Sequence, residues 1–423
     1  MNALARDGVK LSPRLAVLAL LASLAGCDIL PFAPSPSPSA GAPATPAAAP
    51  ATAPPIQPIP FEESILKAAN DLFAKAQIPA AGSGGAQRYP LVIDPLVDGV
   101  TGTQSTATQT MEARIKDLVR TRFPQFEVQK FTTSNIAGSP IVLVGTFTPI
   151  NNAGQASGPR DAYRVCLALA DLKSGKIISK GVARSSIEGV DSTPLPYFRE
   201  SPIWVKDPAT EGYIKTCQGT KPGDPIDPVY ADRILAAALL NDALTAFQGR
   251  RYEESLDLYA SALRTPGGDQ LRAYNGIYLC NWKLGRKQDA SQAFGRLVDY
   301  GLANNRLAVR FLFSPGSTQF LQDAQVSGAY PLWLKQISQR ASQTSACLEV
   351  VGHTSRTGPE PINERLSVLR AQYIKQRLAS AAPGLDNRTI ATGVGSRENL
   401  VGTGADDASD ALDRRVEFKV INC

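Results

Sequence analysis

Polar residues that could hold a small charged ligand follow an apolar segment in the stretch Val351–Ala371. The segment ends in Gly352–Thr354, and a loop with Gly358 and two prolines follows. Asn363 is then a candidate N-cap of a helix. The apolar residues of this helix recur at helical spacing: Leu366, Leu369 and Ile374. Polar side chains at the carboxyl end of a strand, beside a helix N-terminus, suit a small charged ligand.

This stretch resembles the signature of the OmpA-like peptidoglycan-binding domain. The matching elements occur in the family's order: Gly352-His353-Thr354, Asn363, Leu366-Ser367, Arg370-Ala371 and the closing Asp413-Arg414-Arg415-Val416-Glu417. The resemblance extends from about Leu307 to Cys423, and it implies a β-α-β-α-β-β fold. It fails at Ser355, where the family has aspartate.

The resemblance also implies which side chains bind the ligand: Thr354, Ser355, Asn363, Arg370 and Arg415. In the family, the aspartate binds the ammonium group of diaminopimelate in the peptidoglycan stem peptide, and a helix arginine holds a carboxylate. Arg370 takes the place of that arginine. Ser355 can accept a hydrogen bond from an ammonium group but brings no charge, so we expect the amine contact to be weaker by about 1–2 kcal/mol.

Each of these residues also has a purely structural interpretation. Asn363 could be only a helix cap, Arg370 only a solvated helix residue, and Arg415 only half of an ion pair at a strand end. His353 is expected to be a structural residue of the loop, because no second candidate base accompanies it.

Catalysis is not expected from this sequence. The chain has one histidine, so a histidine-rich metal site is excluded. No Gly-x-Ser-x-Gly motif occurs, and the glycine pair in Gly393–Ser396 lacks the lysine of a phosphate-binding loop. We therefore expect a non-enzymatic protein without a cofactor or a metal ion.

Residues 1–26 have the features of a lipoprotein signal peptide. Basic residues precede an apolar run that is too short to span a bilayer. The sequence LAGC that ends at Cys27 resembles a bacterial lipobox, which implies cleavage before Cys27 and its lipidation with fatty acids such as palmitate. An ordinary secretory peptide with a chance cysteine is the alternative. We expect a lipid-anchored protein of the bacterial cell envelope that faces the periplasm, in the outer membrane rather than the inner.

Residues 27–60 are predicted to be a disordered tether, because they are rich in proline and alanine and cannot bury a core. Extended at ~3.1 Å per residue, residues 31–60 would reach roughly 90 Å. The whole chain carries a formal net charge of +6 and contains no run of Lys or Arg, so no nucleic-acid partner is expected.

Residues 61–230 are predicted to form an α+β domain around one sheet covered by helices. Amphipathic helices are expected at Phe61–Gln77 and Thr106–Phe123, and several segments alternate like strands. The pattern weakly resembles periplasmic CsgG/LpoB/TolB-N lipoprotein domains, which bind proteins. Asp94 and Asp98 could be catalytic or metal-binding carboxylates, although turn formation is favoured. The segment 191–230 is expected to be a long loop packed on the sheet, with a partner-binding surface as the alternative.

Residues 231–300 resemble a short tetratricopeptide repeat pair. Ser255 and Tyr259 of the first unit align with Ala290 and Phe294 of the second, 35 residues later. Such repeats bind peptides or proteins, but a single pair could instead brace the two flanking domains. Residues 301–423 complete an α+β multidomain chain with the OmpA-like domain.

Six cysteines in an exported protein predict disulfides. With Cys27 lipidated, we predict that Cys347 pairs with Cys423 and that Cys166 pairs with Cys217. Cys280 is left as a buried thiol.

These features together predict an envelope lipoprotein that anchors a membrane to peptidoglycan through the OmpA-like domain. The alternative is a periplasmic scaffold or regulator that binds protein partners through residues 61–300 and carries a degenerate wall-binding domain.

Overall fold

The computed structural model describes residues 57–76, 78, 88–203, 206–404 and 409–423. The signal peptide, Cys27 and most of the tether lie outside the described residues. The described residues form a mixed α and β structure with two sheets and with helices α1 to α12. Among these residues, no helix combines the length and the apolar character that crossing a membrane requires.

The first sheet has the strand order β3-β1-β4-β5-β6, and β2 also pairs with β4. Its strands are β1 (Tyr89–Ile93), β2 (Val97–Asp98), β3 (Phe126–Gln129), β4 (Ile141–Ile150), β5 (Ala162–Asp171) and β6 (Lys176–Ser185). The β1 strand is parallel to β3 and β4, whereas β5 is antiparallel to both of its neighbours, β4 and β6. Ile59, which we had assigned to the tether, pairs with Ser185 beside β6, so residues 57–60 belong to the fold.

Helices cover both faces of the first sheet. They are α1 (Phe61–Ala74), α2 (Thr106–Arg122), α3 (Thr133–Ala137), α5 (Pro208–Gln218) and α6 (Pro228–Gln248), whereas the short α4 (Pro196–Glu200) packs against α6 and α10 (Ala324–Ser327). Side chains alternate between the faces of a strand, so β4 contributes Leu143 to the core under α1 and α2 and Val144 to the core under α5 and α6. All ten residues of β4 are buried as a result.

The segment 191–230 differs from the long loop that we predicted. It contains α5, whose first residue, Pro208, follows the N-cap Asp207. The Asp207 carboxylate accepts a hydrogen bond from the Thr210 backbone N–H at 2.8 Å. Tyr213 and Cys217 of this helix are buried against the sheet, so the segment is part of the core.

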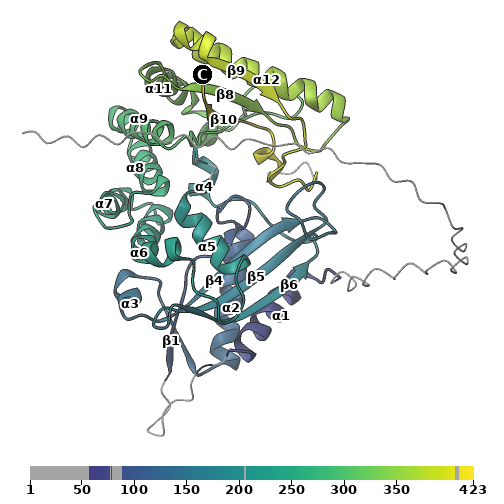
Figure 1. The fold of residues 1–423 in the computed structure, drawn as a ribbon, viewed down its shortest axis with the longest axis vertical. Helices are drawn as coiled ribbons and strands as arrows, with labels where there is room; N and C mark the ends of the chain where they lie inside the picture. The colour runs from purple at the N-terminus through teal and green to yellow at the C-terminus, as the bar shows by residue number, and fades with distance from the viewer. Residues whose placement is uncertain (1–56, 77, 79–87, 204–205, 405–408) are drawn as a thin grey trace, which may run out of the picture. The chain divides into compact units, whose positions relative to one another are not determined.

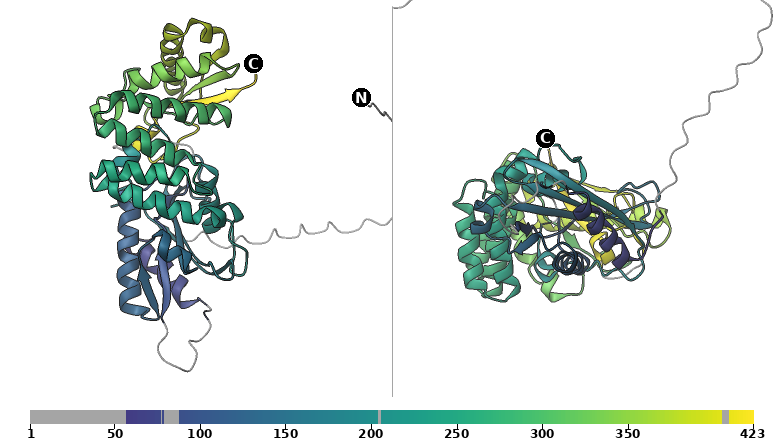
Figure 2. Two further views of the ribbon diagram at one scale, coloured as in Figure 1. Left: turned by 90° about the vertical axis from the view of Figure 1, so that its left-hand side faces the viewer. Right: turned by 90° about the horizontal axis from the view of Figure 1, so that it is seen from below.

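Four helices follow as two antiparallel pairs, stacked in succession in Figure 2. They are α6, α7 (Tyr252–Leu263), α8 (Leu271–Lys283) and α9 (Lys287–Ala303). The turns within the pairs place Arg250 and Gly285, which are 35 residues apart, at positive φ of 59° and 74°. Gly276 lets α8 approach α7, because a Cβ there would lie 2.3 Å from the Tyr259 ring. The backbone thus has the same period as the sequence repeat.

The second sheet has the strand order β7-β10-β8-β9. The elements of this region are β7 (Phe311–Leu312), α10 (Ala324–Ser327), α11 (Tyr330–Ser342), β8 (Cys347–Gly352), α12 (Glu360–Ala381), β9 (Thr389–Gly393) and β10 (Arg415–Ile421). The β8 strand is parallel to β9 and antiparallel to β10. Figure 1 shows α12 lying along this sheet. Apart from the short α10, the order is the predicted β-α-β-α-β-β.

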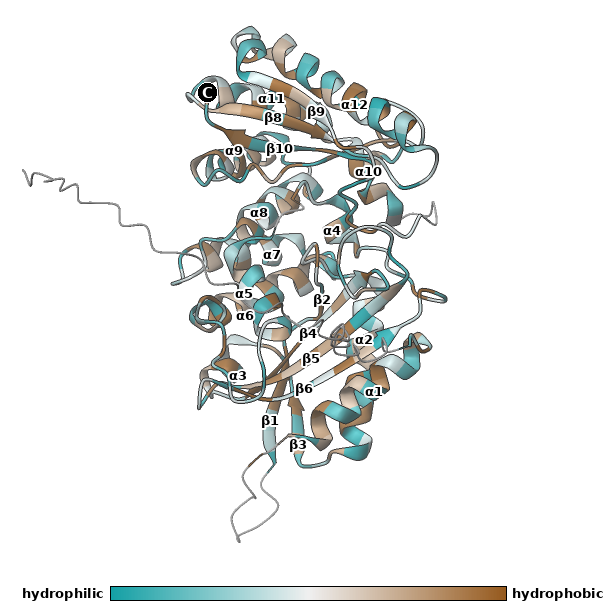
Figure 3. Cartoon of the chain, turned by 45° about the vertical axis from the view of Figure 1, so that its right-hand side comes forward, coloured by the Kyte–Doolittle hydropathy of each residue, from teal (hydrophilic) through white to brown (hydrophobic). Residues whose placement is uncertain are grey.

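Helix α12 differs in detail from the predicted helix. It begins at Glu360, three residues before Asn363, so Asn363 is not the N-cap. Its buried face includes the polar residues Asn363, Ser367 and Arg370, whereas Leu369 of the predicted apolar stripe is 43% exposed. Figure 3 shows polar and apolar residues mixed along this helix. Burial here follows polar contacts of the helix with the sheet and its loops.

The helical pairs and the second sheet share one apolar core. The Trp333 indole N–H of α11 donates to the Tyr278 hydroxyl of α8 at 2.6 Å, and Phe294 of α9 stacks on Trp333 with ring centroids 5.6 Å apart. These contacts hold α8 and α9 against α11.

Candidate ligand-binding site

The candidate site lies where β8 ends against α12. Two glycines allow this close approach, because a Cβ on Gly352 would lie 1.8 Å from the Ser367 carbonyl oxygen and one on Gly393 would lie 2.3 Å from Ser367 Oγ. His353, Thr354 and Ser355 then leave the strand and are all buried.

The loop that follows β9 holds the backbone of these residues. The Thr354 N–H donates to the Gly395 carbonyl at 2.9 Å, and Asn399 Nδ2 donates to the Thr354 carbonyl at 2.7 Å. The Asp413 carboxylate fixes the same loop by accepting three backbone N–H groups, from Leu400, Val401 and Gly402, at 2.6–3.0 Å. The main chain of the site is therefore rigidly positioned.

Two buried side-chain atoms at this site have no hydrogen-bond partner within the described residues. Thr354 is 2% exposed and its Oγ1 is unpaired, and Asn399 is 7% exposed with Oδ1 unpaired. Ser355, the residue after Thr354, is 6% exposed and adds a second hydroxyl. Buried polar atoms are nearly always paired, so such a group of free acceptors and hydroxyls needs a partner from outside the fold.

Arg370 is completely buried, and the backbone uses each of its three nitrogens. Nε donates to the Ser317 carbonyl at 2.9 Å, Nη1 to the His353 carbonyl at 2.9 Å and Nη2 to the Ser314 carbonyl at 3.0 Å. Burial, and secondly the nearby charge of Arg414, lower the pKa of Arg370 to about 9. The solvated helix residue that we considered is excluded. A guanidinium has five N–H donors, and three of those of Arg370 therefore go to backbone carbonyls of the domain itself.

Arg415 is also internal, at 1% exposure. Its Nε donates to Glu417 Oε2 at 2.7 Å, which is the strand-end ion pair that we considered. Glu417 Oε1 in turn lies 3.3 Å from His353 Nε2. Burial, and secondly the charge of Arg415, lower the pKa of His353, so its imidazole is neutral at pH 7. Asn363 points toward the loop before α12 and donates to the carbonyls of Thr357 and Gly358.

The structure places Thr354, Ser355, Arg370 and Arg415 at the end of β8, whereas Asn363 contacts the loop before α12, and all five residues are buried. Sequence reasoning missed Asn399 and gave Asp413 no role of its own. Asp413 directly precedes the Arg-Arg-Val-Glu ending, which was a usable signal. Asn399 lies in a predicted loop, and no sequence motif marks it.

The two predicted cysteine pairs have different outcomes in the structure. Cys347 and Cys423 form a disulfide, with their Cα atoms 5.2 Å apart. Cys166 and Cys217 are thiols whose sulfur atoms lie 2.9 Å apart, so the second predicted bond is absent here. The Cys217 thiol instead donates to the Cys166 carbonyl at 3.0 Å, which holds both side chains without a covalent bond. Cys280 is a buried thiol.

The chain matches no protein-family model and no curated protein. Solved structures similar to part of it include the peptidoglycan-associated lipoprotein from Burkholderia pseudomallei, with 24% identity, a TM-score of 0.23 and coverage of 26% of this chain and 89% of that chain. The C-terminal domain of Helicobacter pylori MotB has 19% identity, a TM-score of 0.23 and coverage of 27% and 84%. An outer membrane protein from Borrelia burgdorferi has 24% identity, a TM-score of 0.19 and coverage of 27% and 85%.

Proposed function

We propose that this chain is a non-enzymatic lipoprotein of the cell envelope that binds peptidoglycan at the end of β8. The observation that supports this most is the buried, unpaired Thr354 Oγ1 beside Ser355 and Asn399 Oδ1. These atoms offer two hydroxyls and one carbonyl oxygen, which can accept hydrogen bonds from an amine and donate to a carboxylate.

The charges around this group favour a ligand that carries a carboxylate. Arg370 and Arg414 lie close enough for the charge of one to lower the pKa of the other. Exposed Arg356 follows Ser355 directly and donates to the Gly402 carbonyl at 3.1 Å. The diaminopimelate of a stem peptide has carboxylates for these arginines and an amine for Ser355. Because Ser355 is uncharged, binding is weak.

The N-terminal segments give the protein its location in this proposal. Acylated Cys27 inserts into the membrane, and the tether lets the folded residues reach the cell wall. Replacement of Cys27 by serine is expected to leave the precursor uncleaved and unlabelled by radioactive palmitate. Continued labelling of that variant would show that Cys27 is not the lipidation site.

The wall-binding proposal is tested by co-sedimentation of the full-length chain with purified sacculi, read as bound fraction against protein concentration. The wild type is expected to bind weakly and Ser355→Asp to bind more tightly. Ser174→Asp adds the same charge in the exposed β5–β6 turn and should behave like the wild type. Equal tightening by both variants would mean that charge alone, and not the site, controls sedimentation.

The internal positions of Arg370 and Arg415 favour a second candidate function. A domain whose two ligand-binding arginines serve its own backbone and Glu417 could be a degenerate wall binder. The protein would then be a periplasmic scaffold or regulator that binds a protein partner through residues 61–300. If neither the wild type nor Ser355→Asp sediments with sacculi, this candidate replaces the first.

A further inference from the structure

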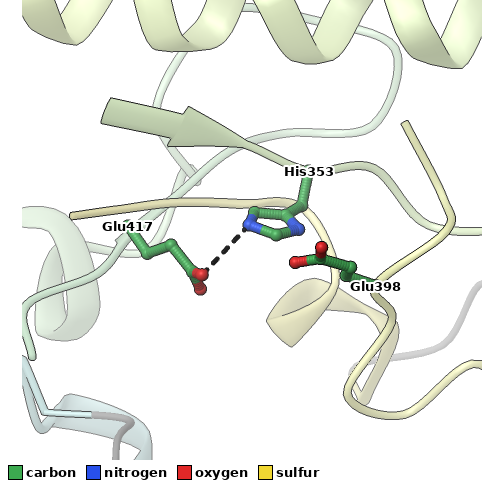
Figure 4. A group of neighbouring side chains, drawn as sticks. All are labelled: His353, Glu398 and Glu417. Carbon is green, nitrogen blue, oxygen red and sulfur yellow. Dashed lines mark ion pairs between the residues drawn. The ribbon is translucent and has the colours of Figure 1, made fainter. Parts of the chain in front are cut away.

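A second polar cluster adjoins the candidate site, because His353 directly precedes Thr354 and Glu398 directly precedes Asn399. It consists of His353, Glu398 and Glu417, and both carboxylates face the imidazole (Figure 4). One atom of each residue that could bind a metal lies within 4.8 Å of the corresponding atoms of the other two. The three residues come from three segments: the end of β8, the loop after β9, and β10.

The imidazole of His353 is unusual because it is completely buried and makes no well-aligned hydrogen bond to the described residues. Its exposure is 0%, and neither Nδ1 nor Nε2 has a hydrogen-bond partner within the described residues. The nearest charged atom is Glu417 Oε1, 3.3 Å from Nε2, and the two are poorly aligned for a hydrogen bond. A buried imidazole normally has a partner on at least one nitrogen. The unpaired nitrogens therefore point to a ligand that the fold does not supply.

The spacing of the cluster fits a small divalent cation. Nitrogen and oxygen atoms bound tetrahedrally at about 2.0–2.2 Å from an ion lie about 3.3–3.6 Å apart. The His353 to Glu417 contact already has this separation, at 3.3 Å. Glu398 is exposed, so its carboxylate can rotate toward the other two and leave the fourth position to water.

Arg415 orients the residues of the cluster but is not itself a metal ligand. Its Nε donates to Glu417 Oε2 and leaves Oε1 facing His353. Its Nη1 and Nη2 donate to the Glu398 carbonyl at 3.3 and 3.4 Å, which holds the third residue nearby. Hydrogen bonds of this kind to metal-binding carboxylates orient them. The two carboxylates carry two negative charges and the Arg415 guanidinium carries one positive charge. The cluster therefore retains a net negative charge that favours a cation.

We propose that His353, Glu398 and Glu417 bind one divalent transition-metal ion, with Zn²⁺ as the best fit. Ca²⁺ and Mg²⁺ prefer all-oxygen sites, whereas one imidazole with two carboxylates suits Zn²⁺. The ion links the loop that carries Glu398 and Asn399 to the end of β8, next to Thr354. One histidine and two distant glutamates form no motif, so this site could not be predicted from the sequence.

The proposal is tested by titrating the full-length chain with Zn²⁺ in a calorimeter while the imidazole C–H signals are followed by NMR. The chain has one histidine, so these signals are unambiguous. We expect one saturable site, a shift of the imidazole signals on binding, and a Kd that rises at least tenfold in Glu398→Gln. Glu398 is exposed, so this substitution does not threaten the fold. The matched control is Glu188→Gln, which changes an exposed glutamate in the first domain and should leave Kd unchanged.

Buried thiols could also bind Zn²⁺, so a second titration uses Co²⁺. Cobalt bound to nitrogen and oxygen shows only weak visible bands, whereas a thiolate ligand at the Cys166 and Cys217 pair adds an intense sulfur-to-cobalt absorption. Absence of saturable binding would overturn the proposal. Binding that leaves the imidazole signals unshifted, or that Glu398→Gln does not weaken, would overturn it as well. Sacculus binding is not part of this test, so the metal site and the wall-binding proposal fail separately.

Discussion

Two strands of this chain that have parallel neighbours end in polar residues, and the two ends differ in how those residues are paired. After β1, the Tyr230 hydroxyl donates to Asp94 Oδ2 at 2.8 Å, and Asp98 Oδ1 accepts from the N–H groups of Val100 and Thr101. After β8, Thr354 Oγ1 and Asn399 Oδ1 are buried and unpaired. Polar residues at a strand end therefore indicate a ligand site only where the fold leaves them without partners.

The largest expected change in unfolding free energy concerns the disulfide between Cys347 and Cys423 in the second sheet. Cys166 and Cys217 in the first sheet are thiols. Cys347→Ser opens a loop of about 75 residues, which the chain-entropy model values at about 4–5 kcal/mol of unfolding free energy. The matched variant Cys166→Ser removes a thiol from the first sheet and should cost less, about 1–2 kcal/mol. Urea unfolding of both variants under oxidising conditions measures the difference. Equal losses would mean that the first sheet also depends on a disulfide, the predicted bond between Cys166 and Cys217.

The next effect is a pH dependence of the unfolding free energy that arises from Asp94, at the end of β1. Burial raises the pKa of Asp94 from its ordinary value of 3.8 to about 7. A carboxyl group whose folded pKa is raised stabilises the fold below its unfolded pKa, and this contribution is lost as pH rises through about 7. Between pH 4 and pH 8 the loss is up to about 4 kcal/mol.

Asp94→Asn should therefore flatten the fall of the unfolding free energy between pH 4 and pH 8. Glu188→Gln, at an exposed position, should leave that slope as it is in the wild type. A slope that Asp94→Asn does not change would show that the carboxyl group ionises in the folded chain without cost.

A smaller loss of unfolding free energy is expected when the guanidinium of Arg370, at the end of β8, is removed. Arg370→Ala leaves the carbonyls of Ser314, Ser317 and His353 without their donor and opens a cavity, which should cost about 3 kcal/mol. Arg356→Ala, at an exposed position with one backbone hydrogen bond, should cost less than about 0.5 kcal/mol. Chemical unfolding gives both values. Loss of sacculus binding by Arg370→Ala at unchanged stability would instead place Arg370 in direct contact with the ligand.

The smallest effect compares the two strand ends by removing one hydroxyl from each. Tyr230→Phe leaves buried Asp94 Oδ2 without a donor and should cost about 1–3 kcal/mol. Thr354→Val keeps the shape of the side chain and removes a hydroxyl that has no partner, so the unfolding free energy should stay equal or rise. Thermal unfolding of the two variants in parallel is sufficient. A loss of 1 kcal/mol or more in Thr354→Val would mean that Oγ1 is paired in solution.

Periodicity and turn chemistry predicted most elements of the second sheet but not its buried polar contacts. The helix start was placed too late because Glu360 and Pro361 were assigned to the loop, although proline is tolerated in the first helical turn. Helix α5 was missed although Asp207 and Pro208 are a typical N-cap and first residue.

The contacts at the end of β8 could not be predicted in this way. The buried face of α12 contains Ser367 and Arg370 because glycines in two strands allow the helix to come close. Whether Thr354 Oγ1 has a partner depends on residues nearly 50 positions away in sequence, and no local pattern encodes that.

The most direct test of the wall-binding account is calorimetric titration of the full-length chain with a stem tripeptide that contains diaminopimelate. The account predicts weak, saturable binding by the wild type and a Kd about five- to thirtyfold lower in Ser355→Asp, because the added carboxylate meets the amine. A tripeptide with lysine in place of diaminopimelate, which lacks the extra carboxylate, should bind less well to both. Absence of saturable binding by both the wild type and Ser355→Asp would contradict the account.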